Sequence, residues 1–489
     1  MLRRTDRPPS FGSAQAGESF MTRRLRISAA AVLAATLVCA SCTTEQRQPT
    51  AGTPVDGATG SAPGLGWSLS PSDVGIEGGQ FRDPVHGSAI DSMESGSISD
   101  GSTVVTLVGR LDGREFVDAT LVGLSIADGS VLWRTPADDV VGCGEEFVDG
   151  QIVCYRGNTG TTSEILTVDA ESGESSTRDA TFPITSLTTA DGHVYATRAV
   201  REGARATVSR GTADALDADW SVQFDSRASP GAPFASTLHT ENGIGLFDDG
   251  RGVFAFDLDT GDNLWSRTIP DCARSGNAAR DGAVRVVRTD CSDPNTIVGS
   301  EIVDTDGTVL AATDSVTLQQ PTFDSPAEES PLLLGTGGYR PSNPEPVWTD
   351  ESLAWAVPSD ITAPAAAFLS THGLAYAITG SVALLRNNDT ATESALDLDT
   401  GNTLWSRESG TFAEVGALDG DVATLFGPEV LRGIDVRTGS TVWDIPVATF
   451  DDEGIDRQSW PMFDRVEADS IYTDSIYTRA LSISVLRAR

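Results

Sequence analysis

The sequence predicts an all-β chain folded as a β-propeller of four-stranded blades, and three observations indicate this fold class. A short phrase containing Gly and then Trp recurs along the chain, a hairpin-turn signal lies between successive copies, and both have a period of roughly 40–50 residues. Units of that length with four short strands are typical of propeller blades. A single such sheet buries too little apolar surface to fold alone, so the units must stack on one another.

The repeated phrase predicts how the units stack. In each clear copy Trp follows Gly by four positions, so we expect Gly to take the positive φ of a tight turn and the indole to pack against the neighbouring blade. Degenerate copies surround Gly173, Trp220 and Gly307. The clear copies are GLSIADGSVLW (123–133), AFDLDTGDNLW (255–265), ALDLDTGNTLW (395–405) and GIDVRTGSTVW (433–443), with docking residues Trp133, Trp265, Trp405 and Trp443.

The turn signals predict the number of blades. Short motifs such as DGQIVCY at 149 and DGHVYA at 191 begin at positions 100, 149, 191, 242, 281, 372, 419 and 469. They give eight blades most simply, with seven or nine open because 310–360 is poorly marked. Trp67, in GLGWSLS, is predicted to be a docking residue without a blade of its own. The C-terminal segment supplies strands that lack one, so pairing the two ends would close the ring and remove exposed sheet edges.

The N-terminus is expected to be a targeting segment. From Met21, the predicted true start, a basic stretch precedes an apolar one that is too short to span a membrane. The tetrad at 39–42 resembles a bacterial lipobox, which implies that Cys42 carries diacylglycerol with acyl chains such as palmitate. We therefore expect a signal region (1–41), a flexible tether (42–64) and the propeller (65–489). The anchored protein would lie on the extracytoplasmic face of the cell membrane.

Charge excludes several function classes. Asp and Glu number 70 against 34 basic residues, for a formal net charge of −36. Nucleic acid is not an expected partner, because phosphate binding needs a basic surface. The chain has no Lys, which excludes Schiff-base chemistry and a P-loop.

Four cysteines outside the signal region predict two disulfides in an oxidising compartment, with zinc as the rival interpretation. A hairpin turn at 281–282 would place Cys272 and Cys291 directly opposite each other. The turn at 149–150 would place Cys143 and Cys154 diagonally, so this second pair needs a bulge or a strand end.

Other candidate sites favour structural roles. Paired aspartates before the turn glycines, at 257/259, 304/306 and 397/399, resemble fragments of calcium loops, but they are predicted to cap turns. The four histidines, His86, His193, His239 and His372, lie far apart in the sequence, so neither a metal site nor a catalytic cluster is predicted. The Pro-rich stretch 319–348 is predicted to be a long, partner-facing loop.

The repeated phrase resembles the pyrroloquinoline-quinone (PQQ)-like repeat, A-x-D-x-x-T-G-x-x-x-W, over residues 67–489. The resemblance implies a non-catalytic, envelope-anchored scaffold with a protein partner and no cofactor, as in outer-membrane assembly lipoproteins. A propeller that binds carbohydrate or another small ligand stays open as an alternative. A quinoprotein dehydrogenase is less favoured because its adjacent Cys-Cys pair is missing. The Arg-rich, Lys-free composition is similar to that of actinobacterial lipoproteins.

Replacement of the lipobox cysteine tests the predicted anchor. We expect Cys42→Ala either to release the protein into the medium or to leave it with an uncleaved signal, because the acyl acceptor is lost. Membrane partitioning and globomycin-sensitive processing are the measurements. If the variant keeps both properties of the wild type, the anchor does not depend on Cys42.

Overall fold

The structure, a computed structural model, describes most of the chain after residue 61. The described residues are 62, 64–87, 96–112, 115–157, 163–200, 205–225, 237–241, 243–249, 252–268, 272–278, 283–319, 321, 323–341, 343–354, 374–387, 390–408, 414–419, 421–426, 430–446, 462–465, 475–479 and 482–487. Internal contacts divide the chain into units 1–48 and 49–489, and the described residues all belong to the second. The predicted signal region, Cys42, the turn at 281–282 and His372 lie outside the described residues.

Short antiparallel strands form the described part of the chain, and each sheet is named below by its first strand. Five sheets contain four consecutive strands. They are β7 (Val140–Cys143), β8 (Gln151–Arg156), β9 (Glu164–Asp169) and β10 (Ser175–Asp179); β11 (Ser186–Ala190), β12 (His193–Val200), β13 (Arg205–Thr212) and β14 (Ala215–Phe224); β15 (Thr237–Glu241), β16 (Ile244–Asp248), β17 (Val253–Asp257) and β18 (Asn263–Arg267); β19 (Ala273–Ala278), β20 (Val284–Asp290), β21 (Asp293–Val303) and β22 (Val309–Thr313); and β31 (Glu414–Asp419), β32 (Val422–Phe426), β33 (Val430–Asp435) and β34 (Thr441–Pro446).

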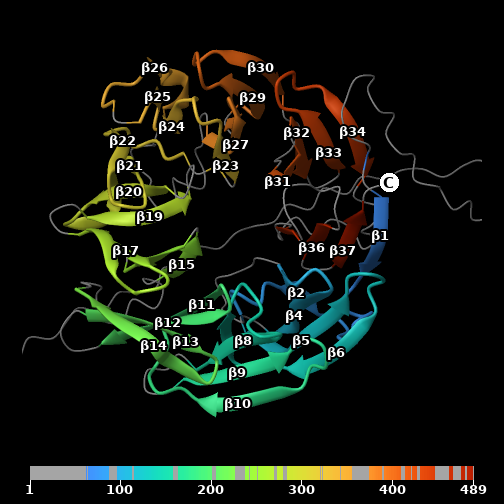
Figure 1. Ribbon diagram of the computed structural model, residues 1–489. Helices are drawn as coiled ribbons and strands as arrows, with labels where there is room; N and C mark the ends of the chain where they lie inside the picture. Colours follow the sequence, from blue (N-terminus) through green and yellow to red (C-terminus); the bar gives the residue numbers. More distant parts are fainter. Residues whose placement is uncertain are drawn as a thin grey trace, which may run out of the picture. The chain divides into compact units, whose positions relative to one another are not determined.

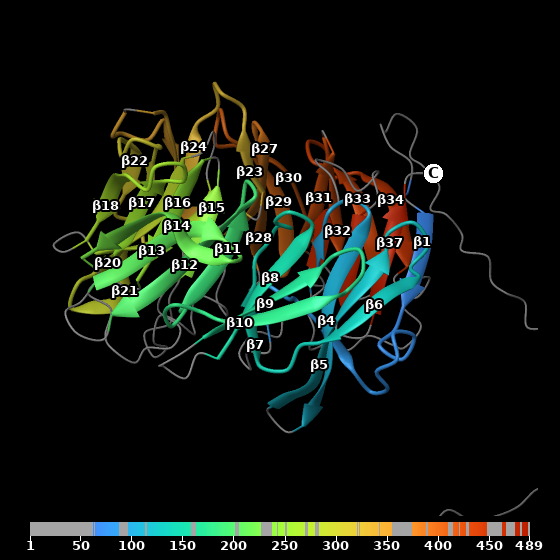
Figure 2. The same cartoon turned by 60° about the horizontal axis from the view of Figure 1, so that its bottom comes forward.

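Three further sheets depart from this plan. The β2 sheet contains β2 (Gln80–Arg82), β3 (Ile98–Ser99), β4 (Thr103–Asp112), β5 (Glu115–Ser125) and β6 (Val131–Pro136). Its β4–β5 hairpin projects beyond the neighbouring strands (Figure 2). The β24 sheet has β24 (Leu332–Leu334), β25 (Gly337–Tyr339) and β26 (Trp348–Thr349), followed by the 3-10 helix η2 (Glu351–Leu353). In the β23 sheet, β23 (Phe323–Pro326) runs parallel to β27 (Leu374–Gly380), which continues into β28 (Val382–Asn387), β29 (Thr392–Asp397) and β30 (Thr403–Glu408).

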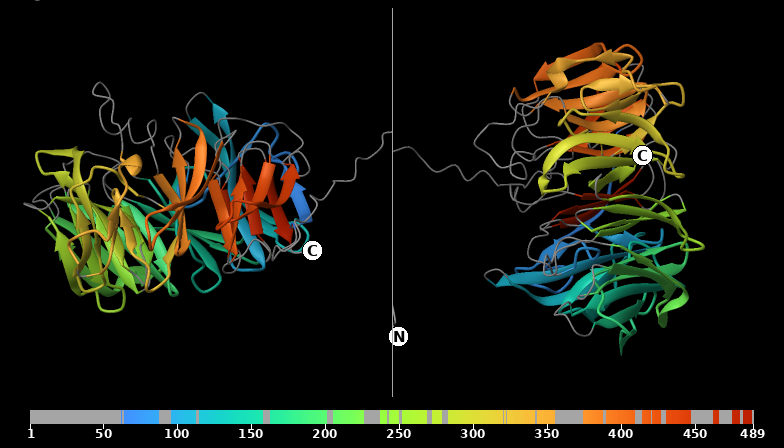
Figure 3. Two further views of the ribbon diagram at one scale, coloured as in Figure 1. Left: turned by 90° about the horizontal axis from the view of Figure 1, so that it is seen from above. Right: turned by 90° about the vertical axis from the view of Figure 1, so that its left-hand side faces the viewer.

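The two ends of the described chain share the last sheet, as predicted. The strand β1 (Gly64–Leu69) pairs with β37 (Ser482–Arg487), which continues to β36 (Ser475–Arg479) and β35 (Met462–Arg465). Trp67 lies opposite Val485, and Ser484 Oγ donates to Ser68 Oγ at 2.8 Å. β2 contacts β36 and β37, while β31 contacts β35, so the series of contacting sheets returns to its start (Figures 1 and 3). This closed series of antiparallel sheets is the predicted β-propeller.

The described strands form nine sheets. Described strands next to the predicted turn positions lie in eight of these sheets, and the additional one is the β24 sheet, within the weakly marked stretch 310–360. The predicted partner-facing loop at 319–348 is therefore wrong: it contains β23–β26, and Leu332, Leu333 and Leu334 are at most 3% exposed. Proline and glycine at its turns gave it the composition of a loop, whereas its short apolar strands are part of the core.

Indole rings join neighbouring sheets through the turn glycines. Trp133 Nε1 donates to the Ala170 carbonyl at 2.8 Å, and a Cβ on Gly173 would lie 2.5 Å from the indole. Gly173 also has a φ of 72°, so the turn needs glycine for its conformation and for the close approach. Six pairs share the ring-on-glycine contact: Trp67–Gly129, Trp133–Gly173, Trp220–Gly261, Trp265–Gly307, Trp348–Gly401 and Trp405–Gly439. Trp67, Trp133, Trp265 and Trp405, for which a docking role was predicted, make this contact, and so does Trp348. Trp443 lies over Gly433 of its own sheet, and its docking role stays a prediction.

Apolar clusters continue the same junctions. One cluster combines Leu107 and Trp133 of the β2 sheet with Ile152 and Leu166 of the β7 sheet. The other clusters likewise draw residues from neighbouring sheets. Each sheet therefore completes its apolar core only against its neighbours, as the repeat predicted.

Both predicted disulfides are present. Cys143 is the last residue of β7 and lies opposite Cys154, with Cα atoms 3.9 Å apart. The pair therefore forms at a strand end, one of the two arrangements that the sequence allowed. The directly opposed geometry predicted for Cys272 and Cys291 is wrong. The Cys272 carbonyl accepts from the Thr289 N–H at 2.9 Å, and Cys291 follows the end of β20. The Cα atoms of Cys272 and Cys291 lie 5.2 Å apart. An irregularity in the β19–β20 register, between Ser275 and Ala278, contributes to this departure from a regular hairpin.

Truncation of one docking indole tests this packing. Trp405 rests on Gly439 and donates to the Val436 carbonyl at 2.8 Å. We expect Trp405→Ala to lower the free energy of unfolding by about 3 kcal/mol, because contacts with the next sheet are lost. The neighbouring Leu404 is 41% exposed, and Leu404→Ala should change stability by no more than about 0.5 kcal/mol. Equal melting curves for the two variants would show that the indole does not stabilise the junction.

Candidate functional site

One sheet departs from the packing rule around the docking indoles. In five sheets the residue opposite the indole on the adjacent strand is small: Gly123, Ala255, Gly338, Ala395 or Gly433. In the β11 sheet the residue opposite Trp220 is Arg210. A guanidinium therefore lies at the junction with the β15 sheet, where the five other sheets place no side chain or a methyl group and the sheet of Trp67 places Val485.

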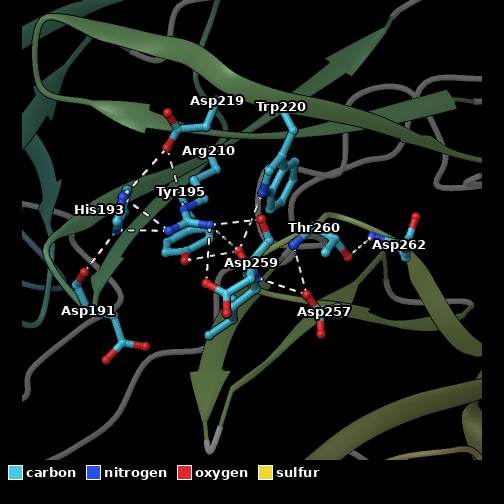
Figure 4. A network of polar contacts seen from close by, with 11 residues as sticks. Asp191, His193, Tyr195, Arg210, Asp219, Trp220, Asp257, Asp259, Thr260 and Asp262 are labelled. Carbon is cyan, nitrogen blue, oxygen red and sulfur yellow. Dashed lines mark hydrogen bonds and ion pairs between the residues drawn. The ribbon is translucent and has the colours of Figure 1, made fainter.

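Arg210 joins the two sheets through the turn between β17 and β18 (Figure 4). Its Nη1 donates to the Leu258 carbonyl at 3.1 Å and to the Asp259 carbonyl at 2.9 Å. The Leu258 carbonyl also accepts from Trp220 Nε1 at 3.3 Å and from the Tyr195 hydroxyl at 3.4 Å. Three donors from the β11 sheet thus meet at one carbonyl of the β15 sheet.

His193 and Asp219 complete the surroundings of this guanidinium (Figure 4). Arg210 Nη2 lies 3.0 Å from His193 Nε2 and 3.1 Å from Nδ1. One Asp219 carboxylate oxygen lies 3.5 Å from Arg210 Nε and 3.6 Å from His193 Nε2. The Arg210 side chain is only 11% exposed, whereas those of His193 and Asp219 are 33% and 37% exposed. The network therefore extends from the sheet junction to solvent.

The polar contacts continue into the β7 sheet. The Asp191 N–H donates to Glu146 Oε2 at 3.2 Å, across the two sheets. Thr189 Oγ1 accepts from the Glu146 N–H at 2.7 Å and donates to its carbonyl at the same distance. These contacts fix the segment that follows β7, which carries Glu145 next to Glu146.

The segment after β2 lies against the same end of β7. The Cys143 N–H donates to the Pro84 carbonyl at 3.0 Å, and the Val85 N–H donates to Asp83 Oδ1 at 2.8 Å. A Cβ on Gly87 would lie 2.5 Å from the Val141 backbone, so this close approach requires glycine. The disulfide at Cys143 holds the β7 end in place, two residues before Glu145.

Electrostatics shows that these segments and β15 bring charged groups together. Burial raises the pKa of Glu145. The negative charges of Asp83 and Glu146 raise this pKa further, whereas His239 and His86 lower it. Burial lowers the pKa of His239, against the attraction of Glu145. Both side chains nevertheless keep a solvent-exposed part. Partly desolvated ionisable groups that water still reaches are typical of binding sites.

We call this set of residues the polar belt. Three of the four histidines belong to it, and His372 lies outside the described residues. Long sequence separation hid the cluster, because its members come from four sheets. The polar belt comprises Asp83, His86, Glu145, Glu146, Asp191, His193, Arg210, Asp219, His239 and Asp259.

The aspartates considered as calcium-loop fragments cap turns, as predicted. Asp257 Oδ1 accepts from the N–H groups of Asp259 and Thr260 at 3.0 and 2.7 Å. Asp397 repeats this arrangement with Asp399 and Thr400. Among the described residues, no group of three or more His, Cys, Asp or Glu side chains could hold a metal ion. In the same part of the chain, no helix is long and apolar enough to cross a membrane.

The lowered pKa of His239 predicts a pH dependence of stability. The unfolded chain binds this proton more readily than the folded one, so His239 reduces stability as pH falls through the ordinary histidine pKa of about 6.5. We expect His239→Gln to reduce the decrease in Tm between pH 7.5 and 5.5, by about 1 °C. Asp179→Asn, at an exposed position of β10, should keep the wild-type decrease. Equal pH profiles for all three proteins would contradict the role of His239.

Comparison with known proteins gives one family match. Residues 117–301 match the family model described as outer membrane protein assembly factor BamB. A comparison with curated proteins found no match. Among solved structures, BamB from Moraxella catarrhalis is 10% identical with a TM-score of 0.41, covering 88% of this chain and 98% of that one. The dihydro-heme d1 dehydrogenase NirN is 9% identical with a TM-score of 0.40, and the match covers 78% of each chain. Apo AztD from Citrobacter koseri is 13% identical with a TM-score of 0.36, and the match covers 75% of this chain and 92% of that one.

Proposed function

We propose that this protein is a non-catalytic scaffold that binds an extracytoplasmic protein partner through the polar belt. One observation carries the proposal: ten ionisable residues, drawn from four neighbouring sheets, form a water-accessible surface. Six are carboxylates, three are histidines and one is an arginine. Charged, partly desolvated surfaces of this kind favour selective association with a complementary protein.

The division of roles among the side chains supports this proposal. Trp133, Trp405 and the other docking indoles face the glycine turns of neighbouring sheets, so they serve the packing of the propeller. The residues of the polar belt instead keep exposed fractions, such as 90% for the Asp259 side chain. Eight of the ten also lie within 117–301, the part that matches the family of an assembly factor. A protein-interaction role in general agrees with that match.

The lipid anchor at Cys42 belongs to the same proposal and rests on the lipobox at 39–42. A tether rich in Gly, Pro and Thr would let the propeller reach partners close to the membrane surface. Because the protein is strongly acidic, attachment to anionic lipid would depend on the acyl chains and not on charge. An extracytoplasmic location also agrees with the two disulfides.

Site-specific photo-crosslinking in living cells tests the partner surface. A photoreactive amino acid replaces Glu145, Asp259 or, as a control, the exposed Asp179 on β10. We expect positions 145 and 259 to form adducts with the same extracytoplasmic protein and position 179 to form none. Equal adducts at all three positions, or none at 145 and 259, would contradict the proposed surface.

A second experiment tests the alternative of catalysis. A quinoprotein would bind PQQ in saturable fashion and reduce an artificial dye with alcohols or sugars. We expect neither activity when the purified propeller is titrated with PQQ and calcium. Saturable binding together with substrate-dependent dye reduction would favour the dehydrogenase alternative over the scaffold.

A further inference from the structure

The His193 ring is held in a position where its protonation state matters. The Asp191 carbonyl lies 2.8 Å from Nδ1, so Nδ1 carries the proton of the neutral ring and donates it. Arg210 Nη2 lies 3.0 Å from Nε2 and 3.1 Å from Nδ1, so the guanidinium lies over the face of the ring and not in line with the lone pair of either nitrogen. A neutral imidazole can stack against a guanidinium in this way, whereas a charged ring at the same place repels it.

A second proton would bring two cations to one carboxylate. Protonation at Nε2 places a positive ring against the guanidinium of Arg210. Asp219 lies within 3.6 Å of both groups, so it can neutralise either one. Charge repulsion then favours an arrangement in which Asp219 pairs with His193 and Arg210 withdraws.

We propose that His193, Arg210 and Asp219 form a proton-operated lock between the β11 and β15 sheets. With His193 neutral, the guanidinium lies against the ring and holds the Leu258 and Asp259 carbonyls of the β15 sheet. With His193 charged, Asp219 turns to the imidazolium and Arg210 releases these carbonyls. The proposal goes beyond the proposed function, because the lock is part of the fold and requires no partner.

The other charged groups around the ring do not perform this exchange. Asp257 is committed to its turn, where it accepts from two N–H groups. The Asp259 carboxylate lies 3.4 Å from Arg210 Nη1 and is 90% exposed, so it can follow the guanidinium when it moves. On the β7 side Glu146 binds the Asp191 N–H, which keeps the Asp191 turn in place beside His193. Tyr195 donates to the Leu258 carbonyl and ionises far above the relevant pH, since burial raises its pKa to about 12.

Trp220 provides a direct reporter of the lock. Its Nε1 donates to the Leu258 carbonyl that Arg210 also binds, and its ring rests on Gly261. The full mature chain labelled with 5-fluorotryptophan gives a 19F resonance for this indole, assigned with Trp220→Phe. We expect the resonance to shift along a one-proton curve between pH 8 and pH 5, the range in which imidazoles titrate. The resonance of Trp405, docked in a distant sheet, should not follow that curve.

Three variants decide the origin of the shift. His193→Gln should abolish the titration of the Trp220 resonance, and Asp219→Asn should move its midpoint to lower pH because the imidazolium loses its counter-charge. His239→Gln removes another histidine of the polar belt and should leave the curve unchanged. The Trp405 resonance reports whether each variant is folded, and His193→Asn replaces His193→Gln if that variant is not.

The opposite results would overturn the lock. A Trp220 resonance that does not titrate in the wild type, or that titrates unchanged without His193, excludes the proposed exchange. Loss of the curve in His239→Gln would place the responsible proton elsewhere in the polar belt. None of these measurements depends on partner binding, so failure of the lock and failure of the proposed scaffold role are separate results.

Discussion

The stacking of an indole on the turn glycine of the next sheet is the contact on which the rest of this structure depends. The turn must have a positive φ, and the ring leaves no room for a Cβ, so both requirements fall on the same residue. The residue two positions after the indole then often binds the same turn: Thr135, Arg267 and Arg407 donate to the carbonyls of Gly173, Gly307 and Gly439. These three sheets are thereby held to their successors by ring contact and hydrogen bond together.

Closure of the series makes this arrangement cooperative. The strand β1 contributes Trp67, whose Nε1 donates to the Ile126 carbonyl of the β2 sheet at 2.8 Å, while β36 and β37 come from the C-terminal end. No sheet in the closed series is left without a neighbour to cover its apolar face. Because the first and last segments meet in one sheet, loss of either end would expose two junctions at once.

Local patterns in the sequence were sufficient for the fold but not for the candidate site. The spacing of Gly and Trp is set within one hairpin, so it survives in the sequence as a readable repeat. The partner predicted to lie opposite Cys272 from the position of the hairpin turn was wrong, because an irregularity in the strand changes the register. Such an irregularity leaves no sign in the amino-acid composition. The polar belt has no periodic signal, since Glu145 and His239 are nearly 100 residues apart, on either side of the β11 sheet, and interact only in the folded chain.

Departures from the repeat could still have indicated part of the site. The position opposite the indole is Gly or Ala in five sheets, and Arg210 is the large, charged exception. Small residues there leave room for the indole to pack against the strand, and this position carries no charge. Arg210 replaces part of that apolar contact with hydrogen bonds to backbone carbonyls, whose strength depends on neighbouring charges. The junction between the β11 and β15 sheets is therefore the place where a change in protonation can reach the packing of the propeller.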